Sequence, residues 1–421
     1  WPALAGGGWR PYDAPAMSDA SQWGAGSVRL PRAVWALGGV SLLMDLSSEM
    51  IHSLLPVFLV TGLGVSITML GAIEGVAEAT ASAVKLVSGA WSDRLGRRKP
   101  LALLGYGVAA LAKPLFALAA SAGAVFLARF LDRIGKGIRG APRDALVADV
   151  TPPELRGAAY GLRQSLDTIG ALAGPLVAAG LMVLWDDVRM VFWIAVVPAF
   201  ASSALLWLAV HETPRAPSAA TPAARLPLAA VELSGLGRRC WAVIALTGLL
   251  ALGRYSEAFL LLHAQGLGLA IAATPLVLVV MNVVYAASAY PAGRLSDHLG
   301  RREGVIAVGC LAFVAANLLL ATAQGPLLVF AGAALYGLHM GLTQGLLAGL
   351  LADAAPPHRR GTAFGVFHLA TGVALLPASL GAGLIWDALG APAPFLVSAA
   401  LVALAGLGIA ALGFERRAPR L

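Results

Sequence analysis

Charged side chains are scarce in this chain of 421 residues: they make up only 12% of it, whereas hydrophobic residues make up 58%. A soluble domain typically carries about 25% charged residues. The shortage of charge therefore excludes an ordinary soluble domain and indicates a protein that lies within a lipid bilayer.

Lysine and cysteine are also scarce, and several common motifs are missing. The chain holds 4 lysines beside 26 arginines, but these basic residues form short clusters between apolar runs, which excludes nucleic-acid binding despite the net charge of +8. Its two cysteines, Cys240 and Cys310, lack metal-ligand spacing. A P-loop, a Gly-x-Ser-x-Gly elbow and a His-Glu-x-x-His motif are absent. We therefore expect no metal, no cofactor and no enzymatic activity.

Long apolar runs take up most of the chain. A run of about 20 apolar residues crosses the bilayer as a helix, because every backbone polar group must be satisfied internally, so these runs predict an all-α membrane protein. A transmembrane barrel would instead show alternating segments of about 10 residues. The twelve predicted spans cover 34–60, 68–90, 100–119, 121–138, 156–184, 189–210, 240–264, 271–293, 303–323, 325–351, 360–386 and 391–414.

Composition divides the chain into five parts. Residues 211–239 are rich in proline, alanine and serine, which is typical of a linker, here between two bundles of six helices. The predicted parts are a disordered N-terminal tail at 1–31, a first bundle at 32–210, a cytoplasmic linker at 211–239, a second bundle at 240–414 and a cytoplasmic tail at 415–421.

The two bundles repeat one another with an offset of 204 residues. GAWSDRLGRR, which begins at Gly89, corresponds to GRLSDHLGRR, which begins at Gly293. ADVTPPELRGAAYG at 148–161 corresponds to ADAAPPHRRGTAFG at 352–365 with the same offset. Two separate segments with one offset indicate parallel repeats, and two such halves related by an axis along the membrane normal are typical of transporters.

Basic residues lie on one side of the predicted membrane. Every second loop contains arginines, such as those between Arg94 and Lys99, whereas the alternate loops contain only Arg189. Cytoplasmic loops carry the excess of lysine and arginine. We therefore predict that both termini of this multi-pass protein face the cytoplasm.

The repeated motif resembles a signature of the major facilitator superfamily. GAWSDRLGRRK at Gly89 is similar to that family's motif between helices 2 and 3, Gly-x-x-x-Asp-Arg-x-Gly-Arg-Arg/Lys, and GRLSDHLGRR is the copy between helices 8 and 9, with His298 in place of arginine. The resemblance implies a twelve-helix transporter similar to bacterial exporters. It further implies a monomer in the plasma membrane, the inner membrane of a bacterium, with a small-molecule substrate and protons as partners.

Two further stretches resemble the exporters of this family. RIGKGIRGA at Arg133 resembles the helix 4 pattern Arg-x-x-Gln-Gly-x-x-x-Ala, with Lys136 in place of glutamine. GALAGPLVAAG at Gly170 resembles the helix 5 antiporter pattern Gly-x-x-x-Gly-Pro-x-x-Gly-Gly, which Gly174 and Pro175 also match. The alternative for the two glycines is ordinary helix packing.

The resemblance also implies a pair of gates. Asp93 is expected to face the N-terminus of helix 11 near Gly361, and Asp297 that of helix 5 near Gly157. A carboxylate there gains about 0.3–1 kcal/mol, so both contacts would hold the cytoplasmic ends of the halves together. The gating residues are Gly89, Asp93, Arg94, Gly96, Arg97, Gly293, Asp297, Gly300 and Arg301. The alternative is that these loops only set the topology, as we expect of Arg98 and Lys99.

Ionisable residues inside a span are costly, by about 2.5–3.5 kcal/mol at a helix centre, and they mark functional sites. In the first span, Asp45, Glu49 and His52 stand at i, i+4 and i+7 and share one face. Because desolvation favours a protonated carboxyl group, we interpret this trio as the main proton-coupling or substrate site. The alternative is a structural ion pair with a neighbouring helix.

Other spans add residues to the predicted cavity. These are Glu74, Glu78, Arg133, Lys136, Arg163, Asp167, Arg254 and Glu257. Buried charges must be paired, so we expect Asp132 and Asp167 to neutralise Arg133 and Arg163. We expect Lys113 to be structural.

These patterns favour a secondary active transporter that exports a small organic molecule or drug in exchange for protons. A proton-coupled importer or a uniporter of organic anions, with Arg133 and Arg163 as substrate ligands, is an alternative. A non-transporting membrane receptor or assembly protein is an alternative of another class, against which the intramembrane charges and the paired motifs argue.

Overall fold

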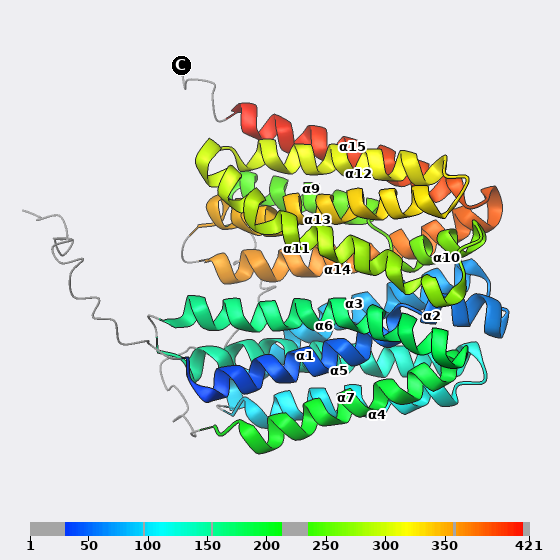
Figure 1. The fold of residues 1–421 in the computed structure, drawn as a ribbon. Coiled ribbons are helices and arrows are strands. Elements are labelled where there is room, and N and C mark those ends of the chain that lie inside the picture. The colour runs from blue at the N-terminus through cyan, green and yellow to red at the C-terminus, as the bar shows by residue number, and fades with distance from the viewer. Residues whose placement is uncertain (1–29, 96, 153–154, 213–234, 357–358, 416–421) are drawn as a thin grey trace, which may run out of the picture.

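The computed structural model describes residues 30–95, 97–152, 155–212, 235–356 and 359–415, and it leaves the side chains of residues 90, 93–95, 360–361 and 413–415 undescribed. Most of the predicted N-terminal tail, of the linker and of the C-terminal tail therefore lies outside the described residues. Figure 1 shows the remainder as a bundle of long helices that run roughly parallel to one another.

The first half contains six spans. Their elements are α1 (Arg32–His52), α2 (Leu55–Val57) and the π-helical η1 (Phe58–Gly62), which together form the first span, then α3 (Ile67–Leu95), α4 (Lys99–Leu118), α5 (Ala122–Asp149), α6 (Arg156–Trp185) and α7 (Val188–Ala209). The predicted spans agree within a few residues except at α5, which was expected to end at residue 138. Arg139 and Arg143, expected in a loop, therefore lie in a helix.

The second half contains the other six spans. Their elements are α9 (Arg238–Gly253) and α10 (Ala258–Gly266), which share the seventh span, then the 3-10 helix η3 (Ile271–Ala273), α11 (Pro275–Leu299), α12 (Arg302–Ala321), α13 (Pro326–Ala354), α14 (Arg360–Leu389) and α15 (Pro392–Glu415). The predicted span over 240–264 is present as Arg238–Gly266, but residues 254–257 interrupt its helix.

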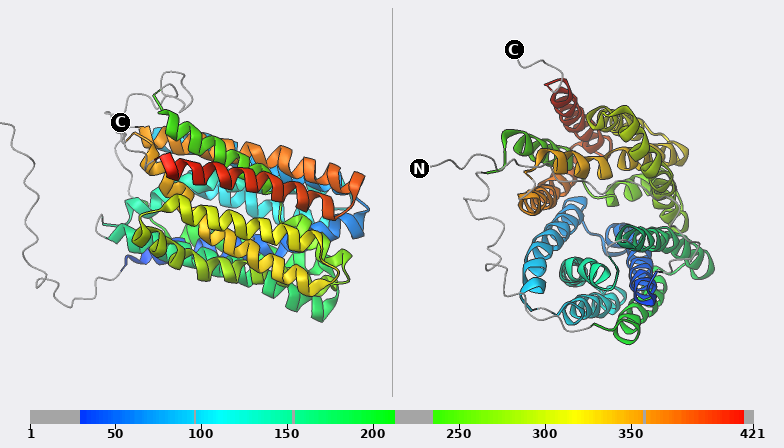
Figure 2. Two further views of the ribbon diagram at one scale, coloured as in Figure 1. Left: turned by 90° about the horizontal axis from the view of Figure 1, so that it is seen from above. Right: turned by 90° about the vertical axis from the view of Figure 1, so that its left-hand side faces the viewer.

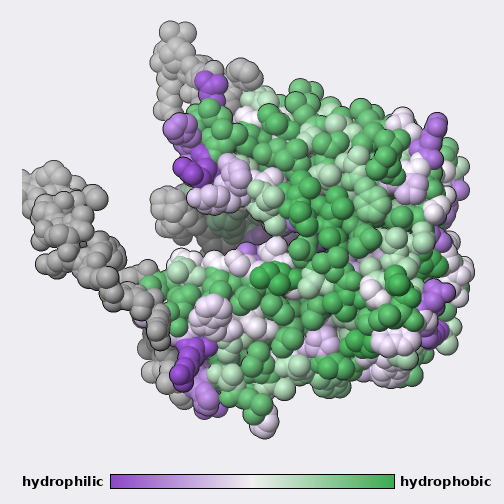
Figure 3. Space-filling view, in the orientation of Figure 1, coloured by the Kyte–Doolittle hydropathy of each residue, from purple (hydrophilic) through white to green (hydrophobic). Residues whose placement is uncertain are grey.

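The outer surface fits a bilayer. Among the described residues, eleven spans are long and apolar enough to cross a membrane; the twelfth, α5, carries too many charged residues to qualify. Large apolar side chains such as Leu111 and Leu407 face outward with exposed fractions of 64% and 70%. On the face that Figure 3 shows, hydrophobic surface covers most of the bundle between its ends, and hydrophilic residues lie near the two ends. The predicted all-α membrane fold is confirmed.

The helices of the two halves pack in equivalent patterns. In the first half, α1 packs against α6 and α7, and α5 packs against α3 and α4. In the second half, α9 packs against α14 and α15, and α13 packs against α11 and α12. Seen end-on, the halves lie side by side (Figure 2). The predicted pair of pseudo-symmetric six-helix bundles is confirmed.

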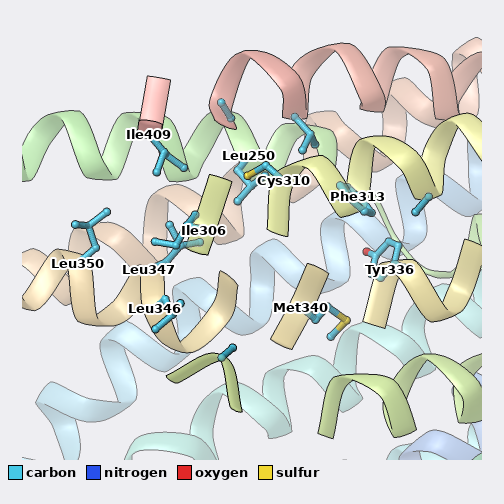
Figure 4. Close-up of a cluster of buried hydrophobic side chains, with 14 of the residues drawn as sticks. Leu250, Ile306, Cys310, Phe313, Tyr336, Met340, Leu346, Leu347, Leu350 and Ile409 are labelled. Atoms are coloured by element: carbon cyan, nitrogen blue, oxygen red, sulfur yellow. The ribbon is translucent and has the colours of Figure 1, made fainter. Parts of the chain in front are cut away.

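Each half has an apolar core. In the second half, Figure 4 shows part of one cluster, with labelled residues Leu250, Ile306, Cys310, Phe313, Tyr336, Met340, Leu346, Leu347, Leu350 and Ile409. Cys240 belongs to the same cluster, so both cysteines are buried packing residues. In the first half, the cluster around Phe116 and Phe192 also contains Leu262 of α10, so apolar packing joins the halves near α10.

Candidate functional site

A cavity of about 750 Å³ lies between the halves and is lined by residues of both. It reaches the end of the bundle where α1 begins and α15 ends, which we call the terminal end; Figure 3 shows a recess there with hydrophilic surface inside it. At the opposite end α10 packs against α2. The structure is therefore open at the terminal end and closed at the other. A cavity of this size suits a small organic molecule.

Two arginines of α5 bind two glutamates of α3 on the cavity wall. The Arg129 guanidinium lies 2.6 Å from the Glu74 carboxylate, and that of Arg133 lies 3.1 Å from the Glu78 carboxylate. Arg133 also hydrogen-bonds the ring of His52. The expected partner of Arg133, Asp132, is more distant at 3.7 Å. Arg133 is therefore neutralised, as predicted, but mainly by Glu78 and not by Asp132, and Arg129 is neutralised by Glu74.

The trio predicted in the first span is divided by the structure. Glu49 and His52 line the cavity and lie 3.7 Å apart. Asp45 is not part of the cavity lining and lies beside Asp167 of α6. The trio therefore extends from the cavity towards a second charged cluster.

Small residues of α6 bring this helix close to α1 behind the trio. A Cβ at Gly170 would lie 3.2 Å from the Cβ of Asp45, and one at Gly174 would lie 2.6 Å from the Cβ of Glu49. Pro175 follows inside the same helix. The predicted helix-packing motif thus positions two of the predicted ionisable residues.

The second charged cluster lies between α5 and α6, outside the cavity lining. Arg163 lies 3.9 Å from Asp167 and 3.6 Å from Asp144, and Arg143 lies 3.1 Å from Asp144. The expected pairing of Arg163 with Asp167 is present, but it is long. Arg163 and Asp167 therefore do not line the cavity, although the sequence predicts that they do.

A buried ion pair supports the cavity wall from behind. The ammonium group of Lys113 on α4 lies 2.8 Å from the carboxylate of Asp132 and donates a second hydrogen bond of 2.9 Å to Ser48 on α1. Both partners of the ion pair are at most 2% exposed. Lys113 thus links α4 to α1 and α5, in line with the structural role expected of it.

The interruption of the seventh span brings polar groups to the cavity. Arg254, Tyr255, Ser256 and Glu257 form the non-helical turn and all line the cavity. The hydroxyl of Ser256 donates a hydrogen bond of 3.3 Å to Glu74 of the other half. Broken helices at the midplane form the substrate sites of many transporters. Arg254 and Glu257 are predicted from the sequence as cavity residues, whereas the break in the helix is not.

The gating motifs are only partly described. The structure does not describe Gly96, and it does not describe the surroundings of Asp93, Arg94 and Gly361 beyond the backbone. Arg97 and Arg301 are exposed, and Gly300 ends α11 with a positive φ of 59°.

The second predicted gate is separated in this structure. Asp297 is 74% exposed and lies 3.7 Å from Arg302 of its own half. A Cβ at Gly157 would meet nothing within 4 Å, and the same holds at Gly293, whereas one at Gly89 would contact Ala141 at 3.4 Å. The expected contact of Asp297 with the α6 N-terminus is therefore not made in this open conformation.

The last arginine of each motif connects two helices of its own half. Arg98 lies 3.0 Å from Asp149 at the end of α5, and Arg302 lies 2.6 Å from Asp353 at the end of α13. The two pairs are related by the offset of 204. The ammonium group of Lys99 donates to the backbone of Trp207. Arg98 and Lys99 thus have structural contacts, and the expectation that they only set topology is wrong.

A carboxylate joins the two halves at the opposite end. Asp387 near the end of α14 accepts hydrogen bonds of 2.9 Å from the backbone N–H and 2.6 Å from the hydroxyl of Thr68, in the first turn of α3. A carboxylate at a helix N-terminus between the halves is predicted from the sequence, but at the terminal end and from Asp93 and Asp297. No motif identified Asp387.

Comparisons with known proteins agree with this architecture. The model of the Major Facilitator Superfamily matches residues 37–279 and 243–421. The chain belongs to the major facilitator superfamily. An uncharacterized MFS-type transporter of Methanocaldococcus jannaschii is 31% identical to this superfamily member over 389 residues, which cover 90% of the present chain and 94% of that relative.

Two further relatives of this superfamily member differ in coverage. The multidrug resistance protein MdtH of Yersinia enterocolitica is 30% identical over 169 residues, 40% of this chain and 41% of MdtH. The crystal structure of the nucleoside transporter NupG shares the fold with a TM-score of 0.77 at 14% identity, over 90% of this chain and 99% of NupG. By family and fold this protein is a multi-pass membrane transporter. Among its described residues, no group of three or more metal-ligating side chains could hold a metal ion.

Proposed function

We propose that this protein is a secondary active transporter that exports a small organic molecule in exchange for protons across the bacterial plasma membrane. One observation carries the proposal: a charged cavity between two halves that is open at one end and closed at the other. Rocking of the halves about such a cavity exposes it to each side in turn, which is alternating access.

Protons are carried in this proposal by the carboxyl groups of the first span. Glu49 faces the cavity and has no arginine or lysine partner among the described ion pairs. Asp45 stands one helical turn nearer the terminal end. A carboxyl group that loses water on closure favours its protonated form, so opening and closing change its proton affinity.

The terminal end is the cytoplasmic end in this proposal, because the arginine-rich loops lie there. The two motif carboxylates, Asp93 and Asp297, hold this end closed in the alternative conformation, in which the cavity faces outward. Export is supported by the partial likeness to the multidrug resistance protein MdtH.

Proteoliposomes with an imposed pH gradient test the proposal. The purified protein is reconstituted with an internal pH-sensitive dye, and organic compounds of different charge are screened for proton flux that depends on the compound. Export predicts that each transported compound moves against the direction of proton flow. Glu49→Gln and Asp45→Asn are expected to abolish this coupling.

Arg238→Gln serves as the matched control, because Arg238 is exposed at the start of α9 and outside the cavity lining. It is expected to retain full coupling. Full coupling in both carboxylate variants refutes the assigned proton site. Compound flux in the direction of proton flow refutes export and favours an importer, and the absence of pH-dependent flux for every compound refutes proton coupling.

A further inference from the structure

The charges that line the cavity do not all find partners within the protein. Arg129 and Arg133 are bound by Glu74 and Glu78. Lys136, one turn beyond Arg133 on α5, also lines the cavity, but it takes part in no ion pair among the described residues. A cation that lacks a partner in a partly dehydrated site is costly unless a ligand supplies the opposite charge.

A second unpaired cation faces the same cavity from the other half. Arg254 lies in the interruption between α9 and α10 and forms no ion pair with a described carboxylate. Its Nε group is buried and has no hydrogen-bond acceptor among the described residues. A guanidinium group presents several N–H donors in one plane, which suits a carboxylate or phosphate group.

Two carboxylates in the cavity lining, one from each half, also lack an arginine or lysine partner among the described residues. Among the described residues, Glu49 of α1 forms no ion pair other than its 3.7 Å contact with His52, and Glu257 in the interrupted span forms none. Each half thus contributes one such cation and one such carboxylate to the cavity lining: Lys136 and Glu49 from the first half, and Arg254 and Glu257 from the second.

The remaining wall of the cavity is apolar and aromatic. The second half contributes Leu250, Leu278, Tyr336, Leu347 and Phe367 to the lining. Such side chains accommodate the body of an organic molecule, while a few polar groups fix its orientation.

We propose that the substrate is an amphoteric organic molecule, whose anionic group binds between Lys136 and Arg254 and whose protonated amine binds the carboxylates Glu49 and Glu257. This inference rests on the proposed function and adds the substrate class to it. A molecule of this kind satisfies all four unpaired charges and contacts both halves at once. Its amine competes with protons for the same carboxylates, which is the negative linkage that an exchange of substrate for protons requires.

Binding measured in detergent, without any gradient, tests the inference separately from proton coupling. The probes are ciprofloxacin, which carries a carboxylate and an amine, its ethyl ester, which retains only the amine, and its N-acetyl derivative, which retains only the carboxylate. Microscale thermophoresis reports each Kd. Ciprofloxacin is expected to bind at least tenfold more tightly than either derivative. Each derivative lacks one of the two charged groups, and therefore one set of charge-assisted hydrogen bonds to the protein.

The variants distinguish the two parts of the site. Lys136→Gln and Arg254→Gln are expected to weaken ciprofloxacin and the N-acetyl derivative about tenfold and leave the ester unchanged, whereas Glu257→Gln weakens ciprofloxacin and the ester only. Arg238→Gln leaves all three unchanged. Circular dichroism and size-exclusion profiles verify that each variant is folded. The inference is overturned if ciprofloxacin fails to bind, if the three probes bind equally, or if the cation and carboxylate variants affect the same probes.

Discussion

Removal of the Asp387 side chain is expected to open the end of the bundle that is closed in this structure. Asp387→Ala removes two hydrogen bonds between the halves, both to Thr68 at the start of α3. Loss of a side chain that caps a helix N-terminus typically costs about 1 kcal/mol. Because 1.4 kcal/mol corresponds to a factor of ten, the population open at this end should rise about fivefold.

A cysteine at Leu262 reports this opening. Leu262 is 5% exposed and packs in the apolar cluster that joins the halves, so Leu262→Cys should react with a maleimide only when that end opens. The native cysteines, Cys240 and Cys310, are buried and give little background. Labelling in nanodiscs should be about fivefold faster with Asp387→Ala. Thr68→Val, which keeps the backbone donor, should show a smaller increase. Equal rates in all three backgrounds would refute the assigned role.

Two further substitutions test the supports of the cavity. Gly174→Ala is expected to cost about 1–3 kcal/mol, because its Cβ would lie 2.6 Å from that of Glu49, and a lowered thermal unfolding midpoint would show this. Asp132→Asn leaves the Lys113 ammonium buried without an anion and is expected to cost about 3–5 kcal/mol. The double variant with Lys113→Met should recover part of that loss; no recovery would contradict a specific ion pair.

The fold could be predicted from the sequence because each span had to satisfy its own backbone in the bilayer. Length and hydropathy located the helices to within a few residues, and the repeated motifs fixed the relation of the halves. The end of α5 was missed, because Arg139 and Arg143 looked like loop residues. Their charges are accommodated within the bundle: Arg139 lies over the ring of Tyr106 on α4, and Arg143 lies near Asp144 of its own helix and Asp167 of α6.

The cavity lining is predicted only in part, because a sequence pattern shows which residues share one face of a helix but not which helix or cavity that face contacts. Eight of the predicted residues line it: Glu49, His52, Glu74, Glu78, Arg133, Lys136, Arg254 and Glu257. Asp45, Arg163 and Asp167 do not line it: Arg163 of α6 faces Asp144 near the end of α5, and Asp45 of α1 lies beside Asp167 of α6. The interruption of the seventh span contains no proline, so the sequence does not predict it and only the structure shows it.

The charge of α5 has a consequence for how the protein is made. This helix cannot leave the translocon for lipid by itself, because it places several cations at membrane depth. Its partners Glu74, Glu78 and Lys113 all stand on α3 and α4, which are synthesised earlier. Membrane insertion of α5 therefore requires that α3 and α4 are already positioned next to the translocon. Loss of Glu74 would reduce the amount of inserted protein before it impaired transport.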